Sequence, residues 1–460
     1  MISGSPITRD ITGEEFYSTI YSLRESPIKK GVIWVVANDG PVHVSEDNGE
    51  SWKDVTPNRL PPGGRVDAVE PSPHDPAKAY IAVLRYQLGD DQPYIYRTND
   101  YGKRWTLLTT GKNGIPDDVP TRVVREDPVR EGLLFAGTEY GMLVSLDDGK
   151  NWHEFQQNLP ITPITDLKII RSDVAISTMG KSFWVLDNIS TLRQEAFTGS
   201  GLEILEPKNT ILYRRTYRQQ RDNPIPEYPD PAVVIDYRLP EQAPTSVTLS
   251  ITDENGVLVN HFSSQQEDEG EGKSDTSAQN ESLMRSGEVS RIETKALKTE
   301  PGMQRFRRNM QHQGPWDKDA EHRFQSGRIV APGRYKITLQ ADGQSVDSFV
   351  TLNTDPRVSL TGTSAEDIEQ QVKLQLNLVS LLSSARRMEH ELQEKSKKQE
   401  LSAREQQQLL SLETPKGIYM EPGLTSQIRY LYNMISRADQ ALGKDALDRF
   451  DVLQKQFEAL

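Results

Sequence analysis

The sequence predicts a mainly β protein with an α-helical C-terminal region. We expect a partial β-propeller of about four blades, then an immunoglobulin-like β-sandwich, then a helical bundle or hairpin. Three observations predict this class. An eight-residue pattern occurs three times in the first third of the chain. Short alternating strand patterns with intervening turn residues follow. From Ser364 onward, the apolar period becomes that of an α-helix.

The length of 460 residues predicts about three domains at ~150 residues per domain. We place the propeller at 1–195, a Pro-rich linker at 196–231, the sandwich at 232–356 and the helical domain at 360–460. Within the sandwich, residues 264–299 are acidic, rich in serine and poor in apolar side chains. Such a segment buries too little surface to offset its ordering entropy, so we expect a disordered insert there.

The composition excludes several classes of function. A formal net charge of −13 argues against nucleic-acid binding, because phosphates require a basic surface. No apolar run approaches the ~20 residues that span a bilayer, so we expect no membrane insertion. The chain has no cysteine, which excludes disulfides and thiolate chemistry. The seven histidines show no metal-ligand spacing and no Gly-rich phosphate loop is present, so no metal or cofactor is expected.

The repeated pattern is [Ser/Thr]-x-Asp-x-Gly-x-x-Trp, and we call each copy a box. The boxes start about 50 residues apart, which is the length of one four-stranded propeller blade. Each follows two alternating apolar strands. The fixed positions are Ser45, Asp47, Gly49 and Trp52, then Thr98, Asp100, Gly102 and Trp105, then Ser145, Asp147, Gly149 and Trp152.

The residue types in the box suit a hairpin turn and not catalysis. The hydroxyl and the carboxylate can cap backbone amides of the turn, and glycine supplies a positive φ. We expect each Trp to bury its ring against the neighbouring sheet. Strands at 173–177 and 182–186 continue the pattern without a box, which predicts a final, degenerate blade.

The strings NDGPVHVSEDNGESWKDVTP, RYQLGDDQPYIYRTNDYGKRW and GKSFWVLDN lie within a segment from Gly13 to Gln194 that resembles the sortilin-type Asp-box propeller family. Its members are often labelled BNR-repeat glycosyl hydrolases. The chain departs from the family at Met179–Trp184, where His-Gly-Arg-Ser-Phe-Trp is expected. Members carry further blades upstream and then a sandwich and a helical tail, so this chain resembles their C-terminal part.

The resemblance implies an exported protein, periplasmic or extracellular, although the chain carries no signal peptide. Four blades cut from a larger ring would leave two unpaired edges. One expectation is that the ring is completed, either by blades from another chain or by self-association. The other is that the chain is a truncated product of a larger exported protein.

The sandwich and tail follow from local patterns. Five short strands between Val233 and Leu352 are separated by turn residues. The basic run Arg305–Arg308 is interpreted as a solvated strand in preference to a nucleic-acid patch. In the tail, Ser364 predicts a helix start, and further helices are predicted near 404–412, 423–442 and 445–459. An intramolecular hairpin is favoured over pairing between chains.

Propeller geometry places the boxes on one face and the turns between second and third strands on the opposite face, where ligand sites gather. We predict that this opposite face holds the ligand, a protein, peptide or glycan. It would carry Asn38, Asp39, Arg65, Arg85, Tyr86, Asp90, Asp91, Arg122, Glu139, Tyr140 and Lys181.

The favoured function is therefore a non-catalytic binding or scaffold module. The alternative, implied by the family label, is a glycoside hydrolase of the sialidase-like propeller type. Its catalytic set cannot be assigned from the sequence, and Asp39, Glu139 and Tyr140 are weak candidates.

Overall fold

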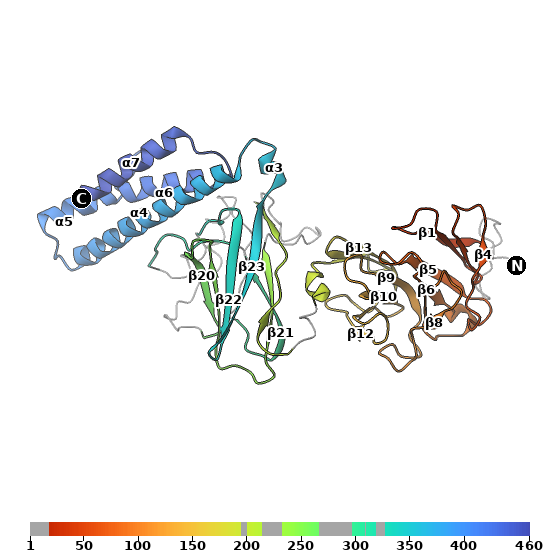
Figure 1. Cartoon of the computed structure of the whole chain (residues 1–460). Coiled ribbons are helices and arrows are strands. Elements are labelled where there is room, and N and C mark those ends of the chain that lie inside the picture. Colours follow the sequence, from red (N-terminus) through yellow and green to blue (C-terminus); the bar gives the residue numbers. More distant parts are fainter. Residues whose placement is uncertain (1–17, 195–199, 214–231, 266–296, 309, 319–326) are drawn as a thin grey trace. The chain divides into compact units, whose positions relative to one another are not determined.

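The computed structural model describes residues 18–194, 200–213, 232–265, 297–308, 310–318 and 327–460 (Figure 1). Most of the expected linker and of the expected disordered insert lies outside these residues. The chain divides into two compact units, Met1–Phe197 and Thr198–Leu460. Each unit is described by itself.

The first unit is built from four antiparallel sheets in which neighbouring strands are consecutive in the chain. The first three have four strands each. They are β1 (Ile20–Glu25), β2 (Ile33–Ala37), β3 (Val42–Ser45) and β4 (Lys53–Asp54); β5 (Arg65–Pro71), β6 (Ala79–Leu84), β7 (Tyr94–Thr98) and β8 (Thr106–Leu107); and β9 (Thr121–Glu126), β10 (Leu134–Thr138), β11 (Met142–Ser145) and β12 (His153–Glu154). The fourth has three strands, β13 (Ile164–Ile170), β14 (Asp173–Thr178) and β15 (Phe183–Leu186).

Successive sheets pack face to face as the blades of a propeller do. Their first strands, β1, β5, β9 and β13, contact one another in order, and we call these the inner strands. One apolar core lies between the first two sheets and contains Trp34 and Ile81, both fully buried. A second core joins the second, third and fourth sheets through Tyr80, Phe135 and Val174. The predicted order of about four blades is therefore present.

The three boxes form the same turn. In the first, the Ser45 hydroxyl accepts a hydrogen bond from the Gly49 amide at 2.8 Å, and the Asp47 carboxylate accepts one from the Ser51 amide at 2.9 Å. The second and third boxes repeat both bonds. The residue before each box glycine also has a positive φ, as Asn48 does at 62°. The predicted capping role is confirmed.

The second unit begins with two sheets that share one apolar core. The smaller sheet is β16 (Glu203–Ile204), β18 (Val233–Leu239) and β21 (Gly302–Arg308). The larger is β17 (Thr210–Leu212), β23 (Gln344–Thr354), β22 (Gly333–Ala341), β19 (Val247–Thr252) and β20 (Leu258–Ser263). Ile235 from one sheet and Leu249 and Ile337 from the other are buried in that core.

Three details differ from the sequence expectations. β16 and β17 lie inside the range expected to be a linker. Leu297, at the end of the expected insert, is buried in the core between the sheets. Arg308, expected on a solvated strand, is only 8% exposed, while Arg305 on the same strand pairs with Asp236 at 2.7 Å.

Helices complete the second unit. They are α3 (Pro356–Ser359), α4 (Ala365–Lys397), α5 (Ala403–Leu412), α6 (Leu424–Ile435) and α7 (Lys444–Glu458). Ser364 and Ser402 begin α4 and α5 with reciprocal capping boxes. α4 packs against α6, and α6 against α7, around Leu378, Ile428 and Leu453, so the tail is a bundle within one chain (Figure 1). No described helix is long and apolar enough to cross a membrane.

Candidate functional site

Each inner strand of the first unit contains a β-bulge at the same place. The register against the second strand shifts between Ile20 and Ser22, between Val66 and Ala68, at Thr121–Val123 and between Ile164 and Asp166. Bulges re-aim a side chain and are frequent beside functional sites. The extra residues of the four strands are Tyr21, Asp67, Arg122 and Thr165, and we call them the bulge row.

Asp67 connects two blades through a pair of arginines. The Arg65 guanidinium donates to its carboxylate through Nε and, at 3.1 Å, through Nη2. Nη1 of Arg122, on the next inner strand, lies 3.7 Å from Asp67 Oδ2. Arg122 Nε also donates to Glu139, which lies in the turn between β10 and β11. Arg122, on an inner strand, thus contacts the turn between the second and third strands of its own sheet.

Burial dominates the electrostatics of this group. Burial raises the pKa of Asp67, and the positive charges of Arg65 and Arg122 act in the opposite direction. Burial also acts against the charge of Arg65, yet its ion pair with Asp67 raises the Arg65 pKa overall. The side chains of Asp67 and Arg122 are only 7% and 6% exposed. The charges of Arg65, Asp67, Arg122 and Glu139 are thus directed mainly at one another.

Aromatic rings flank the charged group and face solvent. The Arg65 guanidinium lies over the Tyr21 ring at 4.7 Å, and that of Arg122 lies 5.9 Å from the Tyr86 ring. Both distances are within cation–π range. Tyr21 is 49% exposed and Tyr86 is 39% exposed. The group thus offers two accessible rings beside a desolvated ionic centre.

The remaining predicted residues form other groups. Arg85 donates to the carbonyls of Pro61 and Pro62, at 2.8 and 3.0 Å, and pairs with Asp90 at 2.7 Å. These bonds fix the link between the first two sheets. Asn38 Oδ1 accepts hydrogen bonds from the Ser18 and Thr19 amides.

The weak catalytic candidates are already engaged or stand apart. Asp39 accepts a bond from the Ser18 hydroxyl at 2.5 Å, and Glu139 accepts one from Arg122. Tyr140 is 54% exposed in its turn. Asp91 and Lys181 are exposed, and the Lys181 main chain bonds Thr178 and Trp184.

A second row of charges lies three residues further along the inner strands. Arg24, Glu70, Arg125 and Lys168 occupy equivalent positions in the strand registers. Arg125 Nη1 lies 3.4 Å from Glu70, and Arg125 Nη2 donates to Asp166 on β13 at 2.6 Å. Burial raises the pKa of Glu70 to about 7, against the opposing effect of Arg125 and Arg24.

Sequence reasoning missed Asp67, Tyr21 and the second row. Asp67 lies between Val66 and Ala68 in a strand with an alternating pattern. Both neighbours pair with β6, and Asp67 is the extra residue of the bulge. The available signal was the recurrence of charged residues at equivalent positions of the inner strands, as in Glu70 and Arg125.

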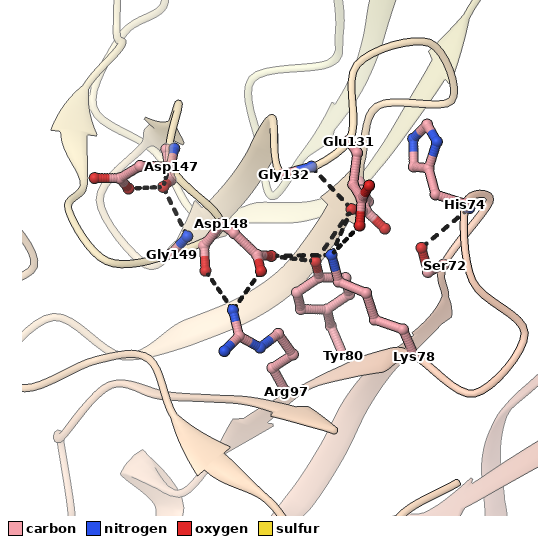
Figure 2. Close-up of polar contacts among 12 residues, drawn as sticks. Ser72, His74, Lys78, Tyr80, Arg97, Glu131, Gly132, Asp147, Asp148 and Gly149 are labelled. Carbon is pink, nitrogen blue, oxygen red and sulfur yellow. Dashed lines mark hydrogen bonds and ion pairs between the residues drawn. The ribbon is translucent and has the colours of Figure 1, made fainter. Parts of the chain in front are cut away.

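On the side of the boxes, a buried polar cluster joins the second and third sheets (Figure 2). Lys78 Nζ lies 3.1 Å from Glu126 and 3.2 Å from Asp148, which belongs to the third box. The Tyr80 hydroxyl donates to Asp148 at 2.6 Å, and Arg97 pairs with the same carboxylate. Burial raises the pKa of Tyr80 well above its usual range. The phenol stays protonated, so the cluster ties two blades together and supplies no nucleophile.

Within the described ranges, no group of three or more histidine, aspartate or glutamate side chains is placed to hold a metal ion.

No family model matches the chain, and no curated protein matches it. Among solved structures, it is similar to YCF48 bound to D1 peptide, with 14% identity and a TM-score of 0.29, over 53% of this chain and 68% of that chain. It is similar to the GH74 xyloglucanase from Xanthomonas campestris, with 12% identity and a TM-score of 0.32, over 72% of this chain and 45% of that chain.

A third similar structure is the extracellular domain of a putative hybrid two-component system from B. thetaiotaomicron. The identity is 11% and the TM-score 0.26, over 74% of this chain and 45% of that chain. The chain thus spans less than half the length of this protein and of the xyloglucanase. The propeller-type arrangement of the first unit is given by its own sheet order and packing, with four blades from β1 to β15.

Proposed function

We propose that the first unit is a non-catalytic binding module whose ligand contacts Tyr21 of the bulge row and Tyr86 beside that row. The observation that carries this proposal is the repeated bulge at the same place on four inner strands, with Asp67 and Arg122 of neighbouring blades 3.7 Å apart. Recurrent bulges aim side chains of different blades at one face, as a ligand site requires.

The chemistry of the face suits a peptide or glycan with little net charge. Arg65 and Arg122 are matched by Asp67 and Glu139, so the centre is balanced in charge. The accessible part is aromatic, because Tyr21 and Tyr86 are about half exposed while Arg122 is nearly covered. Tyrosine offers a rigid apolar face and a polar tip, which suits sugar rings and peptide side chains alike.

A glycan array and a peptide array, each incubated with the full chain, would test this proposal. We expect specific positives that weaken at least tenfold in Tyr86→Ala and in Tyr21→Ala. Tyr419→Ala is the matched control, because Tyr419 is fully exposed in the other unit. Positives that survive both tyrosine substitutions would place the ligand elsewhere and contradict the proposal.

The second candidate is a glycoside hydrolase, and one observation favours it. Glu70 has a pKa of about 7, which suits a general acid at neutral pH, and a second carboxylate, Asp166, shares Arg125 with it. Turnover of nitrophenyl glycosides by the full chain, lost in Glu70→Gln, would establish the hydrolase. The absence of turnover across a broad panel of such substrates would exclude it.

We also propose that the chain is a member of the sortilin-type Asp-box family and is exported. The identical hydrogen bonds of the three boxes support membership. We further propose that the two sheets of the second unit form an immunoglobulin-like sandwich, supported by their shared core around Tyr237 and Leu339. A protein partner, supplying either further blades or a second arc, would complete the ring.

A further inference from the structure

The fourth sheet presents to solvent the face that the other sheets bury. The first residue of β15, Phe183, pairs with the second strand as Val42, Ile95 and Met142 do in the first three sheets. Those three residues are 0%, 0% and 3% exposed, because the following sheet covers them. Phe183 is 84% exposed. The sheet thus carries a blade-packing face without a following blade among the described residues.

A second position repeats this contrast. Val44 and Val144 are 0% and 4% exposed, whereas Val185, at the equivalent position of β15, is 60% exposed. Phe183 and Val185 lie on the same face, because they are two residues apart in one strand. We call this surface the forward face.

At the opposite end of the arc, no sheet precedes the first one among the described residues. The indole of Trp105 donates to the Val55 carbonyl at 2.6 Å, and that of Trp152 donates to the Leu108 carbonyl at 3.2 Å, each on the sheet before. Trp152 is 3% exposed, but Trp52 is 44% exposed, contrary to the expectation that each box Trp is buried. On β1 of the same sheet, Leu23 is 58% exposed. We call the side of the first sheet that carries Trp52 the backward face.

The outer edge of the fourth sheet, formed by β15, is also unpaired among the described residues. In the first three sheets, the third strand pairs with a short fourth strand, as Val144 does with His153. The fourth sheet has no fourth strand among the described residues. β15 reads Phe-Trp-Val-Leu, without the charged residues that natural edge strands use against association.

We propose that two copies of this chain associate head to tail, with the forward face of one against the backward face of the other. Each internal junction joins a forward face to a backward face, and one face of each kind is uncovered among the described residues. A second copy therefore fits both ends. Such a heterologous contact closes into a ring if the rotation allows it and otherwise extends as a filament.

The strand number of the fourth sheet also affects the strength of this contact. At two internal junctions the box Trp donates to a carbonyl of the residue that follows a fourth strand, and the fourth sheet has no such strand among the described residues. The copy covers the Trp52 ring without supplying the equivalent acceptor. The association is therefore weaker than an internal junction and depends on protein concentration.

Light scattering of the full chain over a wide concentration range tests the proposal. We expect the mass to rise from 52.0 kDa to at least twice that value. Phe183→Asp and Trp52→Asp should each stay monomeric, and Ile418→Asp, which changes an equally exposed residue of the other unit, should associate normally. Because each variant keeps one intact face, an equimolar mixture of the two should regain a dimer.

Three results would overturn the proposal. These are a wild-type mass of 52.0 kDa at the highest concentration, unchanged association in Phe183→Asp, or a mixture that stays monomeric. A contact between two identical faces would instead leave one of the two variants dimeric on its own. Circular dichroism checks the fold of each variant, and Phe183→Ser replaces Phe183→Asp if the latter does not fold. Association is independent of ligand binding, since Tyr86→Ala leaves both packing faces intact.

Discussion

Asp67 and Arg122 occupy the same bulged position in two neighbouring inner strands, and their side chains lie 3.7 Å apart. Each is nearly covered, so the pair belongs to the interior of the propeller-type unit while its flanking tyrosines reach solvent. The same bulge recurs in the inner strands, and it carries a side chain of different chemistry in each blade.

Removal of the Asp67 charge should destabilise the first unit. Asp67→Asn leaves Arg65 and Arg122 without their shared carboxylate in a covered site, and breaking such an ion pair costs about 3 kcal/mol or more. Urea unfolding measures the change. Asp91→Asn, at an exposed position, is the control and should stay within about 0.5 kcal/mol of wild type.

Glu70 should make stability fall as the pH rises. Its folded-state pKa of about 7 lies above the ordinary value of 4.5 for glutamate, so the folded chain binds an extra proton between these values. This contribution to the free energy of unfolding is fully present below pH 4.5 and is lost above about pH 7. It amounts to about 3 kcal/mol. We expect the free energy of unfolding to decline from pH 5 to pH 8.

Glu70→Gln should flatten this decline. Asp47→Asn is the control, because hydrogen bonds from Ser51 hold the Asp47 pKa at about 2, outside the window. It should leave the slope between pH 5 and 8 as in wild type. A slope that persists unchanged in Glu70→Gln would assign the effect to another group.

The box tryptophans should differ in their contribution to stability. Trp152 is buried and donates to Leu108, so Trp152→Ala should cost about 3–5 kcal/mol. Trp52→Ala should cost about 1 kcal/mol in the monomer, because that ring is half exposed. Thermal unfolding at low protein concentration compares the two. Equal losses would mean that Trp52 is covered in solution.

Loss of the Lys78 side chain should lower the free energy of unfolding more than loss of an exposed lysine side chain. Lys78→Ala leaves Glu126 buried without its cation, which should lower the free energy of unfolding by about 3–5 kcal/mol. Lys53→Ala breaks the exposed pair with Glu46 and should change it by less than about 1 kcal/mol. Chemical denaturation distinguishes these cases, and similar values for both would exclude a tie between blades at Lys78.

Sequence patterns predicted the features that are fixed by contacts within a short segment of the chain. The box turns followed from Ser45, Asp47 and Gly49 because their hydrogen bonds close within eight residues. Blade geometry predicted Arg122 and Glu139 on one face, and the structure adds that the two side chains pair.

Features that depend on a partner strand or sheet were not predictable from one segment. The bulge at Asp67 is a property of its pairing with β6. The strands β16 and β17 are two and three residues long and exist because β18 and β23 pair with them. Trp52 has the same sequence context as Trp152 but is 44% exposed, and no sheet precedes its own among the described residues.

The most direct test of the binding proposal is a titration of the strongest array positive into wild type and into Tyr86→Ala by calorimetry. The proposed face predicts saturable binding to wild type, at least tenfold weaker binding to Tyr86→Ala, and unchanged binding to Tyr419→Ala. Equal affinity for wild type and Tyr86→Ala, or conversion of the ligand during the titration, would contradict a non-catalytic site at the bulge row.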